Sequence, residues 1–336
     1  MIALPRPYLL FLGDLQRETD AKTAFGVRDW SPESCLGQWT LPGCRVDIGL
    51  PELSPAEAMK LGAKSLLIGA APPGGALPDH WIPTIIEALH VGLDIVSGLH
   101  TPLTQIADIA DVAASHGRGL YDVRHAPYER RVGTGSRRTG RRLLTVGTDC
   151  ALGKKYTALA ITRAMRAEGW PADFRATGQT GIMISGSGIA VDSVVADFIS
   201  GVAEALSPDA PANHWDVIEG QGSLFHPAYA GVTLGLLHGS QPDAMVLCHD
   251  PHRKYIPGFE AFALPTLTEA IALYTQLARR TNPAARIAAI SLNTKALDAQ
   301  ESRRAIEAAE AETLLPAFDP MKHDLAPLLR SLEAVQ

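Results

Sequence analysis

The chain has 336 residues, of which 46% are hydrophobic and 20% charged, and its formal net charge is −6. This composition is typical of a folded protein with packed cores, and the length predicts two domains. The negative charge argues against a general nucleic-acid binder. The four cysteines form no CxxC pair, which predicts reduced thiols in a cytoplasmic protein. The apolar run at residues 8–12 is too short for a secretory signal or a membrane span, so we expect neither.

Strand and helix signals alternate in the N-terminal third. Predicted strands cover 8–12, 64–69, 93–97 and 119–123. One predicted helix begins near Ser54, and two others cover 82–90 and 104–116. The helix near Ser54 starts with a capping-box pattern, because Pro55 follows the serine and Glu57 stands three residues after it. Residues 16–51 contain no clear period and are predicted to be loop-rich. Alternating strands and helices imply a parallel sheet, so residues 1–125 are predicted to form a Rossmann-like domain.

No GxGxxG sequence follows the first predicted strand, so this domain is not predicted to bind a dinucleotide. The segment 126–142 comes next and carries arginines among glycines. Such a run is usually a solvated linker, and we predict one here.

A P-loop pattern opens the second predicted domain, which covers residues 143–336. The apolar run 143–146 leads into a loop bounded by Gly147 and Gly153, and helical spacing follows Lys154. Backbone N–H groups of such a loop, together with the helix N-terminus and the lysine, hold a phosphate. The predicted phosphate-binding residues are Gly147, Thr148, Asp149, Cys150, Gly153, Lys154, Lys155, Tyr156 and Thr157.

Two departures from the common P-loop limit the prediction. Five residues, rather than four, separate Gly147 from Gly153, and Lys155 stands where a nucleotide hydrolase has a magnesium-binding Ser or Thr. Phosphate binding is therefore better supported than phosphoryl transfer. The position of Cys150 before the helix also predicts a lowered thiol pKa.

Polar clusters follow successive predicted strands in this domain. Predicted strands cover 172–177, 216–219, 244–248, 286–292 and 314–317, and predicted helices cover 190–206, 229–237, 268–280 and 300–312. The polar clusters are 149–155, 177–181, 219–223, 249–253 and 293–295. Because the carboxyl ends of parallel strands meet at one edge of a sheet, these clusters are predicted to outline one pocket.

Several side chains of that pocket allow more than one role. Glu219 ends an apolar strand and could hold a metal, orient a water, bind an amine or cap a turn. His226, His249 and His252 are candidate bases, but their spacing matches no HxH or HExxH metal motif. Asn293 stands where several P-loop enzymes bind the base of a nucleotide, although asparagine is also common in turns. Arg253 could bind a carboxylate or pair with Asp250.

Two families resemble this chain. The sequence GTDCALGKK, with Ile218 to Gly222, resembles dethiobiotin synthetase, but only over the C-terminal two-thirds and without the magnesium hydroxyl at Lys155. A closer resemblance extends over nearly the whole chain and rests on GTDCALGKKYTA, RATGQTGIMISGSGIAVD, IEGQGSLFHPAYAGVTLGLLHGSQPDA and CHDPHR. That family was long catalogued as a domain of unknown function, and its described members are D-glutamate N-acetyltransferases (DgcN-type), which act with an N-acetyl-glutamate racemase in D-glutamate breakdown.

The closer resemblance implies transfer of an acetyl group from acetyl-CoA to the amino group of D-glutamate. Lys154 and Lys155 would then neutralise coenzyme A phosphates. Position in the sequence makes Glu219, Asp192 and His226 the candidates for the base that this reaction needs. The predicted substrate-binding residues are Arg175, Thr177, Gly178, Gln179, Thr180, Gln221, Ser223 and Arg253, and Asn293 is assigned to the cofactor.

Two other functions stay open at this point. One is an ATP- and magnesium-dependent ligase or kinase of the dethiobiotin synthetase kind, and the other is a regulatory protein that binds a nucleotide without catalysis. Under the main hypothesis we expect a small-molecule substrate, a homo-oligomer, no resident metal, and neither nucleic-acid nor membrane partners.

Overall fold

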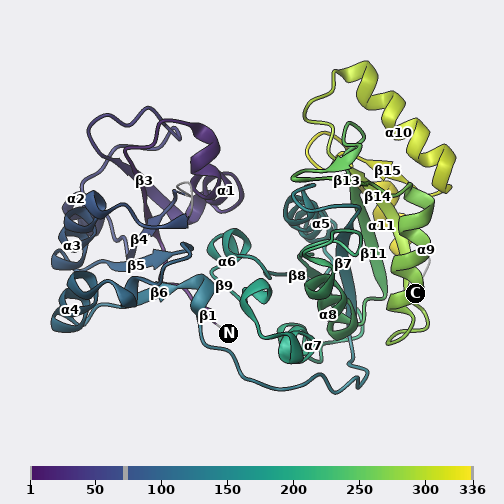
Figure 1. Ribbon diagram of the computed structural model, residues 1–336, viewed down its shortest axis with the longest axis horizontal. Coiled ribbons are helices and arrows are strands. Elements are labelled where there is room, and N and C mark those ends of the chain that lie inside the picture. The colour runs from purple at the N-terminus through teal and green to yellow at the C-terminus, as the bar shows by residue number, and fades with distance from the viewer. Residues whose placement is uncertain (1, 71–74, 334–336) are drawn as a thin grey trace. The chain divides into compact units, whose positions relative to one another are not determined.

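A computed structural model describes residues 2–70 and 75–333, and the chain forms two compact units (Figure 1). The first unit contains the chain up to Tyr128 together with Gly178–Ser193. The second contains Glu129–Thr177 and the chain from Val194 onward. The segment 178–193, which the sequence places in the second domain, thus packs with the first unit. Residues 71–74 of the predicted Pro/Gly loop lie outside the described residues.

The first unit is built on a parallel sheet in the order β3-β2-β4-β5-β6. Counted along the chain this is the order 2-1-3-4-5, which is a doubly wound α/β arrangement. The strands are β2 (Tyr8–Gly13), β3 (Cys35–Thr40), β4 (Ser65–Ile68), β5 (Asp94–Ser97) and β6 (Leu120–Asp122). The helices between them are α1 (Lys22–Trp30), α2 (Pro55–Lys60), α3 (Ile82–His90) and α4 (Ala107–His116). The Rossmann-like prediction is confirmed, and so is the capping box between Ser54 and Glu57.

The prediction of a loop-rich segment at 16–51 is wrong, because this segment contains α1 and β3. Tertiary packing stabilises α1 although no side chain caps its first turn. Ala24 donates its backbone N–H to the carbonyl of Gly69 at 3.1 Å. A Cβ added to Gly69 would lie 2.7 Å from that of Ala24, so the glycine permits a close approach that the local sequence does not reveal.

Part of the middle of the chain completes the first unit. β1 (Ile2–Ala3) pairs antiparallel with β9 (Ser187–Gly188), and α6 (Gln179–Ser185) packs on α1. The Tyr8 hydroxyl donates a hydrogen bond to the carbonyl of Met183 at 3.1 Å. The predicted polar loop 177–181 is therefore corrected, since Gln179 and Thr180 begin a helix.

The predicted single helix over 190–206 is also wrong. Two short 3-10 turns, Val191–Ser193 and Ala196–Phe198, precede α7 (Ile199–Leu206). Both the backbone N–H and the hydroxyl of Ser193 bond the carbonyl of Ala190, which closes a turn in place of a continuing helix. The boundary between the two units falls directly after this turn.

The second unit contains a six-stranded parallel sheet in the order β15-β14-β11-β7-β10-β8. Its strands are β7 (Arg141–Gly147), β8 (Ala172–Arg175), β10 (Trp215–Ile218), β11 (Ala244–His249), β14 (Arg286–Leu292) and β15 (Ala317–Phe318). β7, which carries the P-loop pattern, is central and lies between β10 and β11. Apolar runs such as Leu143 to Val146 are buried, as expected for strands covered on both faces.

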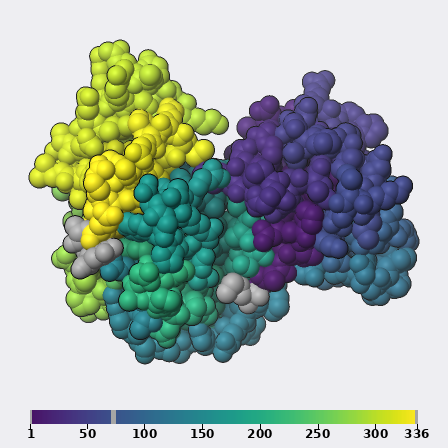
Figure 2. All heavy atoms as spheres, turned by 180° about the vertical axis from the view of Figure 1, so that it is seen from behind, coloured from purple at the N-terminus to yellow at the C-terminus, as the bar shows by residue number. Residues whose placement is uncertain are grey.

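Helices cover both faces of this sheet. α5 (Lys154–Ala167) packs on β7, β8 and β10, whereas α7, α8 (Ala230–Ser240), α9 (Leu267–Ala278) and α10 (Ala299–Thr313) contact one another in sequence. Right-handed crossovers place that row opposite α5. α11 (Ala326–Glu333), which the sequence did not predict, packs on β14, where Arg286 donates to the carbonyl of Ser331 at 2.6 Å. Atoms of this C-terminal segment form the yellow surface in Figure 2.

A short hairpin follows β11 and was also missed. It consists of β12 (Tyr255–Ile256) and β13 (Phe259–Ala263), and every residue of β13 is exposed. Strands this short carry too little periodicity to be predicted from sequence.

The Arg-rich segment is largely exposed, and two of its arginines anchor it to the second unit. The Arg142 side chain is fully buried and donates to the carbonyl of Thr139 at 2.9 Å. Arg138 donates to the carbonyls of Ser207 and Gly239, each at 2.8 Å. Burial lowers the pKa of Arg138 to about 10, with neighbouring Arg142 acting in the same direction. These guanidinium groups satisfy carbonyls that end α7 and α8, which explains why the segment is held.

Among the residues that the structure describes, no helix has both the length and the apolar character needed to cross a membrane.

Candidate functional site

The phosphate-loop pattern lies at the carboxyl end of β7, as the sequence predicted. Gly147 ends the strand, and α5 begins at Lys154. Gly153 has a φ of +105°, which favours glycine, and Ala151 also has a positive φ of +54°. The loop therefore turns sharply just before the helix N-terminus, where backbone N–H groups and the helix dipole favour an anion.

Lys154 folds back across this loop. Its ammonium donates to the carbonyl of Asp149 at 2.7 Å, and only 7% of the residue is exposed. Burial lowers the pKa of Lys154, and the nearby thiols and the Asp149 carboxylate oppose that effect. A Cβ added to Gly220 would lie 3.1 Å from the lysine Cδ, so the glycine after Glu219 leaves room for the lysine stem. The loop thus encloses a lysine ammonium group beside its own carbonyls.

Arg253 stabilises the loop from the segment after β11. Its guanidinium contacts the Asp149 carboxylate at 2.7 Å and donates to the carbonyl of Cys150 at 2.8 Å. The same carboxylate accepts the backbone N–H of Cys150 at 2.6 Å. Arg253 therefore pairs with Asp149, whereas the sequence offered Asp250 as its ion-pair partner.

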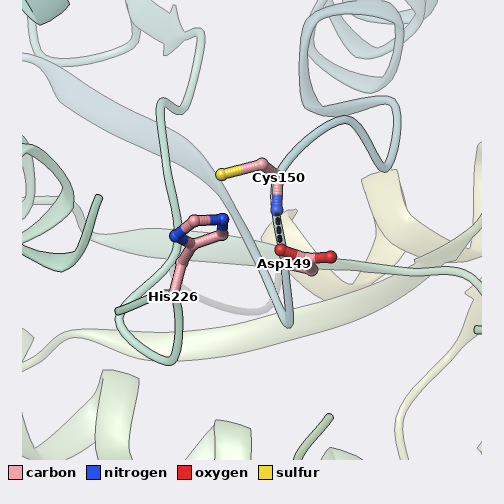
Figure 3. Close-up of side chains that lie close together, drawn as sticks. All are labelled: Asp149, Cys150 and His226. Carbon is pink, nitrogen blue, oxygen red and sulfur yellow. Dashed lines mark hydrogen bonds between the residues drawn. The ribbon is translucent and has the colours of Figure 1, made fainter. Parts of the chain in front are cut away.

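The side chain of Cys150 extends from the loop on the side where His226 lies (Figure 3). Ligating atoms of Asp149, Cys150 and His226 lie within 4.8 Å of one another. Burial raises the pKa of the Cys150 thiol, which outweighs the lowering effect of Lys154. The predicted low thiol pKa is wrong, because Cys150 precedes α5 by several residues and lies in a half-buried position.

Glu219 lies next to the loop at the end of β10, which pairs with β7 as predicted. Its residue is 3% exposed, and one carboxylate oxygen accepts the backbone N–H of Thr177 at 3.0 Å. The Thr177 hydroxyl in turn donates to the Glu219 carbonyl at 2.6 Å, and the Gln221 amide donates to that hydroxyl at 3.1 Å. These bonds fix the carboxylate at the carboxyl edge of the sheet.

Lys155 is close enough to Glu219 for the two charges to interact. Burial lowers the pKa of Lys155, while the Glu219 carboxylate acts in the opposite direction. The Lys155 ammonium lies 4.4 Å from the centre of the Tyr156 ring. Lys155, which replaces the magnesium-binding hydroxyl of common P-loops, thus adds a cation on the Glu219 side.

Three predicted residues have side chains engaged in the packing around the loop. The Thr157 hydroxyl is buried and shares a 2.8 Å hydrogen bond with Ser291. Ser223 is fully buried, and its hydroxyl accepts the backbone N–H of Phe225. The Asn293 side chain accepts the backbone N–H of Lys295 at 3.3 Å, as in a turn. The hydroxyls of Thr157 and Ser223 are therefore engaged in buried hydrogen bonds within the protein.

His249 belongs to the other side of the loop. Its Nδ1 lies 2.9 Å from the Thr148 hydroxyl. Burial lowers its pKa, and the neighbouring Asp250 acts in the opposite direction.

Tyr274 was not predicted, although its buried hydroxyl donates to the Gly147 carbonyl at 2.8 Å and accepts the backbone N–H of Leu224 at 3.1 Å. It lies within the apolar period of α9, so no sequence signal distinguishes it from a core residue.

Arg175 extends from the end of β8 toward acidic side chains of the same sheet. It donates to Asp216 at 2.6 Å and approaches Asp173 at 3.5 Å. His214 joins these two carboxylates, and the three groups have the spacing of a metal site. Arginine neutralises the buried carboxylate in this cluster, as Arg253 does at Asp149.

Four other predicted residues belong to the first unit: Gly178, Gln179, Thr180 and Asp192. Asp192 pairs with Arg124 of the same unit at 3.1 Å. Thr180 shares a 3.4 Å contact with the Thr23 hydroxyl. Their assignment to substrate binding or catalysis stays a prediction.

Family models match the chain in two parts. One, described as a Rossmann-like domain of unknown function (DUF1611_N), matches residues 39–126, and the other, a P-loop domain of unknown function (DUF1611_C), matches residues 131–329. The chain belongs to the DUF1611 family. This result confirms the family resemblance and the predicted fold class of a Rossmann-like domain followed by a P-loop domain.

Curated relatives and a solved structure agree with this DUF1611 assignment. A protein from Pseudoalteromonas sp. named D-glutamate N-acetyltransferase is 46% identical over 97% of this chain and 98% of its own length. A protein of the same name from Tritonibacter scottomollicae is 46% identical over 98% of this chain and 99% of its own. The crystal structure of a DUF1611 family protein from Anabaena variabilis is 32% identical, covers 98% of this chain and 99% of its own, and superposes with a TM-score of 0.84.

Proposed function

We propose that this protein is an amino-acid N-acetyltransferase that moves the acetyl group of acetyl-CoA to the amino group of D-glutamate. The observation that carries the proposal is the 46% identity, over nearly the full length, to two curated relatives of that name. The loop chemistry supports it independently, because coenzyme A carries a pyrophosphate and a 3′-phosphate that a P-loop can bind without phosphoryl transfer.

The loop suits a phosphate ligand better than it suits magnesium nucleotide chemistry. Lys154 and Lys155 supply positive charge at the start of α5, where backbone N–H groups converge. Lys155 stands where the magnesium-binding hydroxyl would be, and the Thr157 hydroxyl is engaged with Ser291. We assign both lysines to the coenzyme A phosphates.

Acetyl transfer also requires a group that accepts the amine proton. The amine nitrogen forms a bond to the thioester carbonyl carbon, the carbon–sulfur bond breaks, and the amine loses a proton. Glu219 is our first candidate for this base, because its carboxylate is fixed beside the loop. Asp192, which pairs with Arg124, is the second candidate.

The two substrate carboxylates need cationic partners. Arg253 is the candidate nearest the loop, and its side chain is 20% exposed although it holds Asp149. Arg175 is the other candidate, with a side chain that is 23% exposed and a bond to Asp216. An arginine suits this task because its guanidinium can bind a carboxylate through two parallel hydrogen bonds.

An assay with acetyl-CoA and a panel of D- and L-amino acids, following free thiol, tests the proposal. We expect turnover with D-glutamate above all others and no loss of rate in excess EDTA, because no step requires magnesium. A P-loop with a lysine also suits an ATP-dependent ligase or kinase. Release of ADP that depends strictly on magnesium, with no thiol release, would replace our proposal with that alternative.

The base is tested by Glu219→Gln, which keeps the size and hydrogen bonding of the side chain but removes its basicity. General-base catalysis contributes roughly 10²- to 10⁴-fold in rate, so kcat should fall by about that factor with little change in the KM for acetyl-CoA. The matched control is Glu307→Gln on the exposed side of α10. Near-normal turnover of Glu219→Gln at every pH would transfer the role to Asp192.

A further inference from the structure

The His226 ring is enclosed and has one nitrogen in a defined hydrogen bond. The residue is 4% exposed, and its Nδ1 lies 3.1 Å from the backbone nitrogen of Ala228, two residues further on. The Tyr229 ring lies 4.6 Å from the imidazole, centre to centre, and the Phe259 ring packs edge-on at 5.0 Å. These contacts restrict rotation of the imidazole.

The contact with Ala228 determines which ring nitrogen carries the proton. A backbone N–H can only donate, so Nδ1 must accept and cannot itself hold a hydrogen. A neutral imidazole with a bare Nδ1 carries its proton on Nε2. In the neutral ring of His226 the N–H donor is therefore at Nε2.

That donor faces the phosphate loop. Figure 3 shows the ring nitrogen remote from the side-chain stem turned toward Cys150 and Asp149. The charged and titratable groups around the ring are the Asp149 carboxylate, the Cys150 thiol and the Tyr229 phenol. Arg253 and the backbone N–H of Cys150 bind the Asp149 carboxylate.

We propose that His226 is a fixed hydrogen-bond donor whose Nε2–H binds the carbonyl oxygen of the acetyl thioester, and that it is not the general base. This inference rests on the proposed function. When the amine nitrogen bonds to the carbonyl carbon, the π electrons of the carbonyl move to oxygen, where Nε2–H stabilises the negative charge. The carbonyl then re-forms, the carbon–sulfur bond breaks, and the coenzyme leaves as a thiolate. The amine proton goes to a separate base.

The same tautomer has a consequence for Cys150. A ring that presents Nε2–H toward the thiol cannot take its proton at that nitrogen, so this tautomer does not make Cys150 and His226 the thiolate–imidazolium pair of cysteine acyltransfer enzymes.

The tautomer is measured by NMR on the full chain labelled with ¹⁵N-histidine. Two-bond nitrogen–proton spectra distinguish protonated from bare ring nitrogens, and His226→Gln identifies the signals among the 11 histidines. We expect a bare Nδ1 and a protonated Nε2 in the neutral ring. A proton on Nδ1 of the neutral ring would overturn the inference.

Kinetics of three variants test the role of the donor. Gln can place an amide N–H close to the position of Nε2, so His226→Gln should retain more activity than His226→Leu, which should lose roughly 10²- to 10³-fold in kcat. His238→Leu is the control. This histidine lies on α8, and its ring contacts the carbonyl of Leu277 on α9. Equal losses in the Gln and Leu variants, together with disappearance of a fall in kcat toward low pH, would identify a base instead.

The two levels of failure are separable. An inactive wild-type chain contradicts the acetyltransferase proposal and with it the thioester as the partner of Nε2–H, whereas the NMR spectrum decides the tautomer in either case. An active chain whose neutral His226 ring carries its proton on Nδ1 contradicts this inference alone.

Discussion

Lys154 is the residue whose environment says most about the ligand. Its ammonium is buried and bonded to a loop carbonyl, and we propose that a phosphate oxygen takes the place of this carbonyl when a ligand binds. Exchanging one neutral acceptor for an anionic one strengthens the bond without moving the charge far. Cys150 lies in the same loop, but burial raises the pKa of its thiol and so favours the uncharged form.

Replacing Lys154 with Met should weaken coenzyme A binding and leave the fold intact. A hydrogen bond to a charged group contributes about 1.5–3 kcal/mol, which is a loss of roughly 10- to 100-fold in affinity. Calorimetric titration with coenzyme A measures the effect, and thermal unfolding checks the fold. Lys60→Met, on the exposed side of α2, is the control. Unchanged affinity in the Lys154 variant would contradict the phosphate assignment.

His249 should make stability depend on pH. Burial lowers its pKa below the ordinary value of 6.5, so between the two values the unfolded chain holds a proton that the folded chain lacks. The free energy of unfolding must then fall as pH drops from about 6.5 through that window. His249→Gln should give a shallower fall in urea unfolding between roughly pH 6.5 and 5. His252→Gln, at an exposed position, should match the wild type. Parallel curves for wild type and His249→Gln would refute this account.

The pairing of β7 with β10 brings the loop and Glu219 together. The two strands are adjacent and parallel, and the turn after β10 is fixed by the bond from the Gly220 N–H to the Thr145 hydroxyl at 2.9 Å. A Cβ on Gly220 would lie 1.7 Å from the Thr145 carbonyl oxygen, so no larger residue fits between the strands. The glycine after Glu219 is therefore required by the close contact of two strand ends.

Gly220→Ala should separate these strand ends. Overpacking of this kind costs about 1–3 kcal/mol, and the displaced Glu219 should lower kcat as well. Gly231→Ala in the first turn of α8 is the matched control, because an added Cβ there meets nothing within 4 Å and should stabilise the helix by at most about 1 kcal/mol. Chemical denaturation measures the free energy of unfolding, and the thiol assay measures kcat. Equal stability of the two variants would mean that the backbone relaxes around Gly220.

At the scale of the whole molecule, the chain leaves the second unit and returns to it. Residues 178–193 form α6 and β9 of the first unit, although they lie between strands of the second in sequence. Their apolar side chains, among them Ile182, Met183 and Ile184, are buried. The two units therefore cannot be separated by a single cut after Tyr128.

A fragment of residues 129–336 should fold poorly for this reason. The buried apolar residues of α6 would be exposed to water, which favours aggregation. The same fragment with 178–193 replaced by a Gly/Ser linker of equal length should be monodisperse and melt cooperatively. Size-exclusion chromatography and thermal unfolding compare the two. Equal solubility of both fragments would show that α6 does not depend on the first unit.

Local sequence determined those parts of the protein whose signals are short-range. The P-loop strand and helix, the capping box at Ser54, and most strands of both sheets follow from hydrophobic period and turn residues, because these depend on neighbours in the chain. The order of polar clusters after strands also predicted that Glu219 would lie beside the loop, since parallel strands end at one edge.

Tertiary structure alone decided the features that depend on residues far apart in sequence. The Arg-rich segment is anchored by carbonyls about 70–100 residues away, and α1 and α6 are stabilised by packing that no local pattern encodes. The pairing of Arg253 with Asp149 and the support from Tyr274 each need two groups brought together by the fold. A thiol pKa likewise follows burial, which is a property of the folded chain and not of the loop sequence.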